Sequence, residues 1–88
     1  MEYQLNKTDI WLMQVLESNE ATNRITAMTI GEIMAVMESA GNGKNRTTIY
    51  RRLRQLVELG YIAKGVPDDH AATFYIIEKG KYFLKGEI

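Results

Sequence analysis

Residues 46–62 read RTTIYRRLRQLVELGYI, and this stretch decides the fold. The apolar residues that recur in it at three- and four-residue spacing, and so share one side of a helix, are Ile49, Leu53, Leu56 and Val57. Gly60 follows as the kind of residue that commonly ends a helix in the left-handed conformation. Residues 61–64 then favour an extended strand. The stretch predicts a helix that begins near residues 45–47 and runs directly into a strand.

Two shorter helices are predicted before this stretch. The first begins at Thr8 and Asp9, where a hydroxyl cap precedes an acidic residue in the first turn. The second begins at Thr29, which Glu32 follows after three residues in the capping-box pattern. The apolar residues that give each helix one buried side are Ile10, Leu12, Met13, Val15 and Leu16 in the first, and Ile30, Ile33, Met34 and Met37 in the second. Between the first and second helices we expect a loop over residues 19–24 and a brief edge strand over residues 25–28. A turn over residues 39–43 is expected after the second helix.

One more strand and a short helix are predicted after these elements. Residues 73–77 have the strongest strand-forming composition in the chain, and residues 65–72 connect them as a hairpin to the strand at 61–64. Residues 78–85 are expected to form a closing helix. This order predicts an α+β fold in one domain over residues 1–88, with three helices, a two- or three-stranded antiparallel sheet and a short C-terminal helix.

This order of elements and two sequence motifs resemble the winged helix-turn-helix superfamily of bacterial and archaeal regulators, in the broad style of PadR-like and MarR-like proteins. Residues 46–62 resemble the recognition helix of that superfamily running into the first wing strand. Residues 74–84, FYIIEKGKYFL, resemble the second wing strand and its continuation, with Ile77 where threonine is common. The resemblance covers roughly residues 8–85 and implies a fold in which the third helix is exposed to DNA.

Two features depart from the usual pattern of that superfamily. The turn over residues 39–45 is longer and richer in glycine than the tight turn of a plain helix-turn-helix motif. The wing carries Asp68 and Asp69 where many DNA-binding wings carry Arg or Lys, and these acids would repel phosphate. We therefore expect the wing to lie beside the DNA backbone or to be used elsewhere, rather than to insert into the minor groove.

The charges of the chain sum to zero but are distributed unevenly. Residues 1–38 contain six acidic and two basic side chains, whereas residues 39–64 contain six basic side chains and one acidic side chain, Glu58. Because DNA responds to the local field within about a Debye length, the basic segment forms a patch that can attract phosphate. The zero net charge therefore does not exclude a nucleic-acid partner.

The composition excludes several other classes of protein and site. The chain has no Cys, which excludes disulfides and thiolate chemistry, and its single histidine, His70, has no partner for a metal site. The GNGK sequence at 41–44 is not a P-loop, because Glu38 stands where that motif needs glycine and Asn45 stands where it needs Ser or Thr. No apolar run has the length of a membrane span and the first residues lack the basic-then-apolar layout of a signal peptide, so a cytoplasmic protein with no membrane partner is expected. We expect no cofactor and no enzymatic activity.

The candidate DNA-contacting residues lie on or beside the exposed side of the helix predicted at about residues 46–59. Arg can pair bidentately with guanine, Gln with adenine, and Thr can contact a thymine methyl group or a phosphate. Because the N-terminal residues of a recognition helix usually reach the bases, the expected base contacts are Arg46, Thr47, Thr48, Tyr50 and Arg51. The expected phosphate contacts, which position the domain without reading sequence, are Lys44, Arg52 and Arg54. Asn45 and Gln55 complete the candidate set.

A second interpretation of the same helix remains open. The arginines between residues 51 and 54 would also solubilise a surface helix, in which case Glu58 or Glu38 would be their partners. Tyr50 would then pack half-buried under the wing. Five basic residues and no acid between Lys44 and residue 54 favour DNA.

The expected function is therefore sequence-specific binding of double-stranded DNA by a transcriptional regulator that reads the major groove with the helix over residues 46–59. One such helix reads only a few base pairs, so a homodimer is expected, formed through the first helix or through residues 82–84. Two alternatives are a winged-helix module for protein–protein contact and a replication or partitioning protein that binds DNA in the same way. The residues indicate no particular small-molecule effector.

Overall fold

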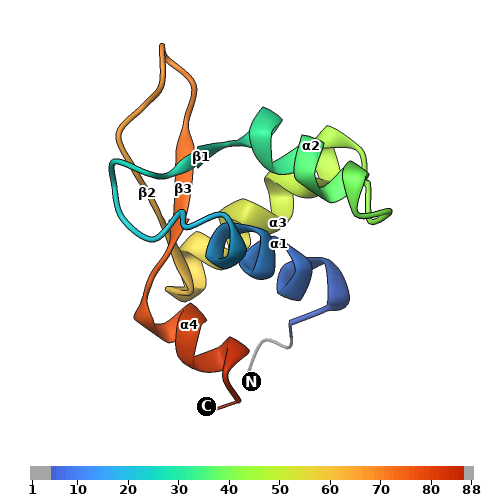
Figure 1. Cartoon of the computed structure of the whole chain (residues 1–88), viewed down its shortest axis with the longest axis vertical. Coiled ribbons are helices and arrows are strands. Elements are labelled where there is room, and N and C mark those ends of the chain that lie inside the picture. Colours follow the sequence, from blue (N-terminus) through green and yellow to red (C-terminus); the bar gives the residue numbers. More distant parts are fainter. Residues whose placement is uncertain (1–4, 87–88) are drawn as a thin grey trace.

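The computed structural model describes residues 5–86, which form four helices and one three-stranded antiparallel sheet. The helices are α1 (Lys7–Ser18), α2 (Ile30–Ser39), α3 (Arg46–Leu59) and α4 (Glu78–Leu84). The strands are β1 (Met28–Thr29), β2 (Ile62–Lys64) and β3 (Thr73–Ile76). The connection between β2 and β3 projects beyond the helices, and α4 lies at the opposite end of the molecule (Figure 1). This is the predicted winged helix-turn-helix order, and it confirms the fold class.

The start of α1 differs from the expectation. Asn6, and not Thr8, is the N-cap residue, because its side-chain oxygen accepts a hydrogen bond from the Asp9 backbone N–H at 2.9 Å. The Asp9 carboxylate accepts one in return from the Asn6 backbone N–H, also at 2.9 Å. Asparagine caps helices at least as well as threonine, and this reciprocal pair satisfies two N–H groups that a helix start leaves without partners. The helix therefore begins one residue before Thr8.

The sheet places β3 between β1 and β2. Met28 of β1 and Ile62 of β2 pair with Phe74 and Ile76 of β3, respectively, so β1 is the edge strand that the sequence predicted. It covers residues 28–29 rather than 25–28. The reason is local: the Asn23 side-chain oxygen accepts hydrogen bonds from the backbone N–H groups of the two residues at 25–26, at 2.9 and 3.0 Å, and holds them in a turn.

The core lies where α1 meets the other helices and β3. Its buried residues come from α1, α2, α3 and both long strands, and the largest are Leu12, Met13, Leu16, Ile33, Met37, Ile49, Leu53, Leu56, Ile62, Phe74 and Ile76. The residues predicted to face the core from α2 and α3 do so, with Met34 and Val57 partly buried at its edge. Among residues 5–86, every helix is too short or too polar to cross a membrane.

Two backbone features fix the geometry at either end of the β2–β3 hairpin. Gly60 ends α3 in the left-handed conformation with a φ of 84°, as predicted. At the tip, Asp68 and Ala71 exchange backbone hydrogen bonds around Asp69 and His70, whose φ values of 50° and 74° also lie in the left-handed region. Consecutive left-handed residues match the twist of a tight two-residue hairpin. The wing therefore ends in a narrow tip.

Candidate nucleic-acid interface

The start of α3 is held by its own cap. Asn45 accepts a hydrogen bond from the Thr48 backbone N–H at 2.8 Å through its side-chain oxygen. The first turn of α3 lies beside Lys44 and Arg46, both of which are exposed. A helix N-terminus and two cations make this end of α3 electropositive. The structure therefore gives Asn45 a capping contact at the place where it was expected to contact DNA.

One open hollow of about 330 Å³ covers the side of α3 that faces away from the core. We call its lining residues the outer face of α3, and they are Thr47, Tyr50, Arg51, Arg54, Gln55 and Glu58. Five of these six belong to the predicted DNA-contacting set, so the helix brings together residues chosen from the sequence alone. Thr48, the remaining member of the first turn, is half-buried beside them. The outer face offers hydroxyl, phenol, guanidinium and amide groups, which are the groups that bind base edges and phosphates.

Tyr50 and Arg54 contact each other on this face. The Arg54 guanidinium carbon lies 5.9 Å from the centre of the Tyr50 ring, and Tyr50 retains 46% of its surface exposed. Tyr50 thus lies on the outer face of α3 rather than half-buried under the wing. A guanidinium at this distance from an aromatic ring is attracted to it, which limits the orientations that the Arg54 side chain adopts. The contact with Tyr50 therefore partly fixes the direction in which the Arg54 guanidinium points from α3.

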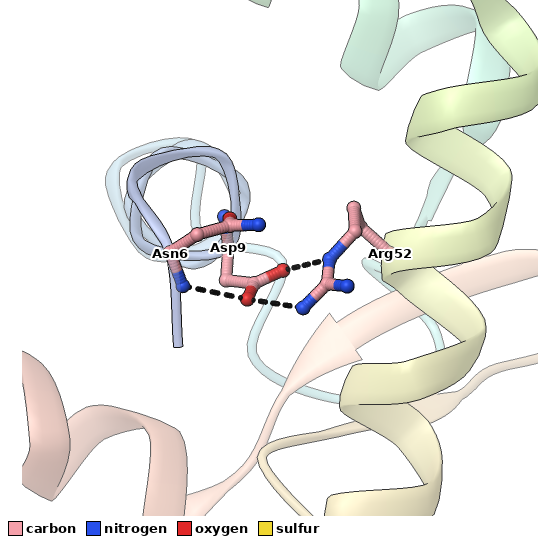
Figure 2. Close-up of polar contacts among 3 residues, drawn as sticks. All are labelled: Asn6, Asp9 and Arg52. Carbon is pink, nitrogen blue, oxygen red and sulfur yellow. Dashed lines mark hydrogen bonds and ion pairs between the residues drawn. The ribbon is translucent and has the colours of Figure 1, made fainter. Parts of the chain in front are cut away.

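Arg52 does not share the outer face of α3. Its side chain points toward α1, where Nε donates a hydrogen bond to Oδ1 of Asp9 at 2.7 Å and the second terminal nitrogen donates to Oδ2 at 2.6 Å (Figure 2). Asp9 is fully buried and Arg52 is 18% exposed. The structure therefore replaces the predicted phosphate contact of Arg52 with a bidentate ion pair between α3 and α1. Asp9, and not Glu58 or Glu38 as the second interpretation of the sequence expected, forms this ion pair with Arg52.

Burial and hydrogen bonding act in opposite directions on Asp9. Burial raises the pKa of the Asp9 carboxyl above its usual value, and the hydrogen bond from the Asn6 backbone N–H lowers it. A buried carboxylate is disfavoured unless a cation and hydrogen bonds compensate for the lost hydration. Arg52 supplies the cation in the fork geometry that matches a carboxylate. The pair is therefore a structural contact that fixes the middle of α3 against the start of α1.

One sequence signal did point to Asp9. It lies three, four and seven residues before Leu12, Met13 and Leu16, so it occupies a position of the buried side of α1. A carboxylate at such a position needs a cationic partner. The signal does not identify Arg52, which is 43 residues away in the chain.

The surroundings of the outer face are of mixed charge. Glu32 and Glu38 of α2 are exposed, and the Glu32 carboxylate is engaged in the cap of α2, where it accepts a hydrogen bond from the Thr29 backbone N–H at 2.9 Å. The wing tip exposes Asp68 and Asp69. Within the described part of the chain, no three His, Cys, Asp or Glu side chains gather as metal ligands. Near the outer face, positive charge therefore comes from α3 and from Lys44 before its start.

The sequence matches no protein-family model and no curated protein, but solved structures share its fold at low identity. The DNA-binding TubR fragment from Clostridium botulinum has a TM-score of 0.71 at 22% identity, over 98% of this chain and all of the fragment (100%). RosR from H. salinarum has a TM-score of 0.75 at 19% identity, over 96% of this chain and 71% of that protein. The ferric uptake regulator from Pseudomonas aeruginosa, with manganese, has a TM-score of 0.69 at 23% identity over 88% of this chain. The present chain spans about half, 55%, of that regulator, and the likeness shows a shared winged-helix fold.

Proposed function

We propose that this chain is a sequence-specific regulator that binds double-stranded DNA and places α3 in the major groove. The observation that supports this most directly is the outer face of α3, where residues capable of reading bases lie together without an acidic side chain before Glu58. A structural role alone does not require two arginines and a tyrosine to be exposed on one side of a helix. The proposed role is binding, without catalysis and without a cofactor.

The candidate residues divide by their place on α3. Thr47 and Arg51 lie within the first two turns, so they are the proposed contacts with base edges. Lys44, Arg46 and Arg54 surround them and are the proposed contacts with phosphate. For Arg46 this replaces the base contact expected from the sequence, because Arg46 is the first residue of α3 and does not line the outer face. Arg52 is omitted from the proposed interface because Asp9 engages its guanidinium.

The similar structures support the same proposal. The TubR fragment is described as DNA-binding, and a ferric uptake regulator from Vibrio cholerae is described as rearranging its DNA-binding domains. These proteins share the winged-helix fold with the present chain, and such folds present the helix equivalent to α3 to DNA. The winged-helix fold by itself hosts other functions, and it is the residues on the outer face of α3 that favour DNA binding here.

We further propose that the regulator acts as a homodimer. A single recognition helix contacts too few base pairs to select one site among the many that a genome offers, and a two-fold dimer doubles those contacts. The candidate surface lies where α1 packs against α4, at the end of the molecule opposite the wing (Figure 1). Tyr82 exposes 42% of its surface there, and Trp11, Phe83 and Leu84 are only partly buried.

Salt dependence of duplex binding tests the proposal. Fluorescence anisotropy with a labelled duplex selected from a random library should give an affinity that falls as salt rises, with a log–log slope of roughly −5.4 if each chain of the proposed dimer neutralises three phosphates. Lys7→Ala, which removes an exposed cation at the start of α1, is the matched control and should leave the affinity unchanged. Failure to enrich any duplex would contradict the proposal. Capture of an acidic protein partner in the absence of any enriched duplex would favour the protein–protein alternative.

A further inference from the structure

A second hollow lies on the other side of the sheet from the core and shares no lining residue with the outer face of α3. It has a volume of about 740 Å³ and is lined by residues 22–26 together with Val66 and Tyr75. Phe74 and Ile76 of β3 are buried in the core, so Tyr75 between them points to the opposite side of the sheet. The hollow is wide and open to solvent, so it would hold one side of a small molecule and leave the other side exposed.

The hollow has an apolar wall that the fold leaves exposed. Ile25 exposes 81% of its surface and Val66 exposes 44%. The turn built on Asn23 holds the backbone of Ile25 in place, because the Asn23 side-chain oxygen accepts the Ile25 N–H at 2.9 Å. The exposed isoleucine is thus presented by a hydrogen-bonded turn. Together with the Tyr75 ring, these side chains offer apolar contact to a flat or branched body.

Arg24 makes the hollow positive. Its backbone oxygen accepts a hydrogen bond from the Val66 N–H at 3.0 Å, which fixes Arg24 at the base of the wing. Among residues 5–86, its guanidinium has no hydrogen-bond or ion-pair partner. The lining contains no acidic residue, and its other polar groups are the neutral side chains of Thr22, Asn23 and Thr26. A guanidinium without a partner beside an apolar wall is complementary to an anion on an apolar body.

We propose that this hollow is a binding site for a small amphipathic anion. The apolar body of the ligand lies against Ile25, Val66 and Tyr75, and its carboxylate or sulfonate accepts hydrogen bonds from Arg24. The inference depends on the geometry of the hollow and not on the proposed DNA binding.

Occupancy of this site would act on the wing through existing contacts. The Thr73 hydroxyl donates a hydrogen bond to the Val66 backbone oxygen at 2.8 Å, and the Gly65 N–H donates to the Thr73 backbone oxygen at 3.1 Å. The lining residue Val66 is therefore linked directly to β3 through Thr73, and it follows the end of β2 by two residues. A ligand seated against Val66 would restrict the base of the wing.

A matched pair of probes tests the proposal on the full chain. We would titrate ¹⁵N-labelled protein with 2-naphthoate and with its neutral analogue 2-naphthamide, and follow backbone amide shifts by NMR. The expected result is that naphthoate shifts the amides of residues 22–26, Val66 and Tyr75, and binds about tenfold more tightly than the amide, the ratio that 1.4 kcal/mol produces. Shifts confined to α3, or no saturable shift in the hollow, would overturn the proposal.

Three variants separate charge from apolar contact. Arg24→Gln should lower the naphthoate affinity to that of naphthamide and leave the latter unchanged. Ile25→Ser should weaken the binding of both probes. This variant should still fold, because the Ile25 side chain is exposed. Ala35→Ser, at an exposed position of α2 outside the hollow, is the control and should change neither affinity. An unaltered naphthoate affinity in Arg24→Gln would show that the site does not recognise the anion.

Discussion

Arg52 of α3 and Asp9 of α1 form a bidentate ion pair whose two hydrogen bonds measure 2.7 and 2.6 Å, in a position where the carboxylate is fully buried (Figure 2). The same carboxylate accepts the Asn6 N–H that caps α1. One side chain thus closes the start of α1 and fixes the middle of the proposed recognition helix. Loss of the Asp9 charge should therefore affect both the fold and the placement of α3.

We expect Asp9→Asn to lower the free energy of unfolding by about 3 kcal/mol, because it removes the buried carboxylate that forms a bidentate ion pair with a largely buried guanidinium. Urea denaturation followed by circular dichroism measures the change. The double variant Asp9→Asn with Arg52→Met should recover most of the loss, because it also removes the largely buried cation. A loss below about 1 kcal/mol in Asp9→Asn would show that the pair is weak.

Arg51→Ala tests base recognition on the outer face of α3. If Arg51 pairs with a guanine, the variant should lose about 1–3 kcal/mol of binding to the selected duplex and tolerate any base pair at one position. Arg54→Ala should instead weaken binding to all duplexes by a similar factor, since phosphate contacts carry no sequence information. The measurement is anisotropy against a panel of single-base-pair variants of the site. Identical effects of the two substitutions would contradict the assigned roles.

The acidic wing tip gives the opposite expectation. Asp68→Asn combined with Asp69→Asn should leave DNA affinity unchanged or increase it, because the two carboxylates repel phosphate. Asparagine is chosen because it tolerates the left-handed backbone of Asp69. The same anisotropy assay detects the change. A marked loss of affinity would show that the acids take part in recognition, by accepting a hydrogen bond from cytosine N4.

Gly65→Ala tests the close packing between the wing and the loop before β1. A Cβ added at Gly65 would lie 2.5 Å from Cβ of Ala27 and 2.7 Å from the backbone oxygen of Arg24. Such overlap should cost about 1–3 kcal/mol of stability. Gly43→Ala is the control, because the nearest atom to its added Cβ is 3.5 Å away. Urea denaturation curves that coincide for the two variants would show that the packing at Gly65 is loose.

Light scattering tests the homodimer. At micromolar concentration the mass should be near twice the 10.1 kDa of one chain, with DNA absent. Tyr82→Glu should shift the mass toward one chain, since it places a charge in the proposed interface. Ile25→Glu adds the same charge at an exposed apolar position elsewhere and should leave the dimer intact. A mass of one chain with and without DNA would end the dimer proposal.

Local signals predicted most of the helices. The capping box of Thr29 and Glu32 and the Gly60 stop lie within a few residues of the ends they mark, so sequence spacing alone locates the start of α2 and the end of α3. The same spacing predicted which side of α3 is exposed. These features depend on neighbours along the chain, which a sequence displays directly.

Contacts between residues far apart in the sequence could not be predicted in this way. The partner of Arg52 lies in another helix, and the hollow beside Arg24 forms only when the loop before β1 meets the wing. The predicted start of α1 was wrong for a different reason. Asn6 and Thr8 are both good N-cap residues, and the reciprocal hydrogen bonds between Asn6 and Asp9 decide in favour of Asn6.

The pairing of β1 with β3 has a consequence for synthesis of the chain. Met28 and Phe74 are paired across the two strands although they lie 46 positions apart in the sequence. On the ribosome, the first three helices are made before β3 exists, and until then the places of Phe74 and Ile76 in the core are empty. We expect the nascent helices to remain unstable until β3 emerges, so that the domain folds late and in one cooperative step.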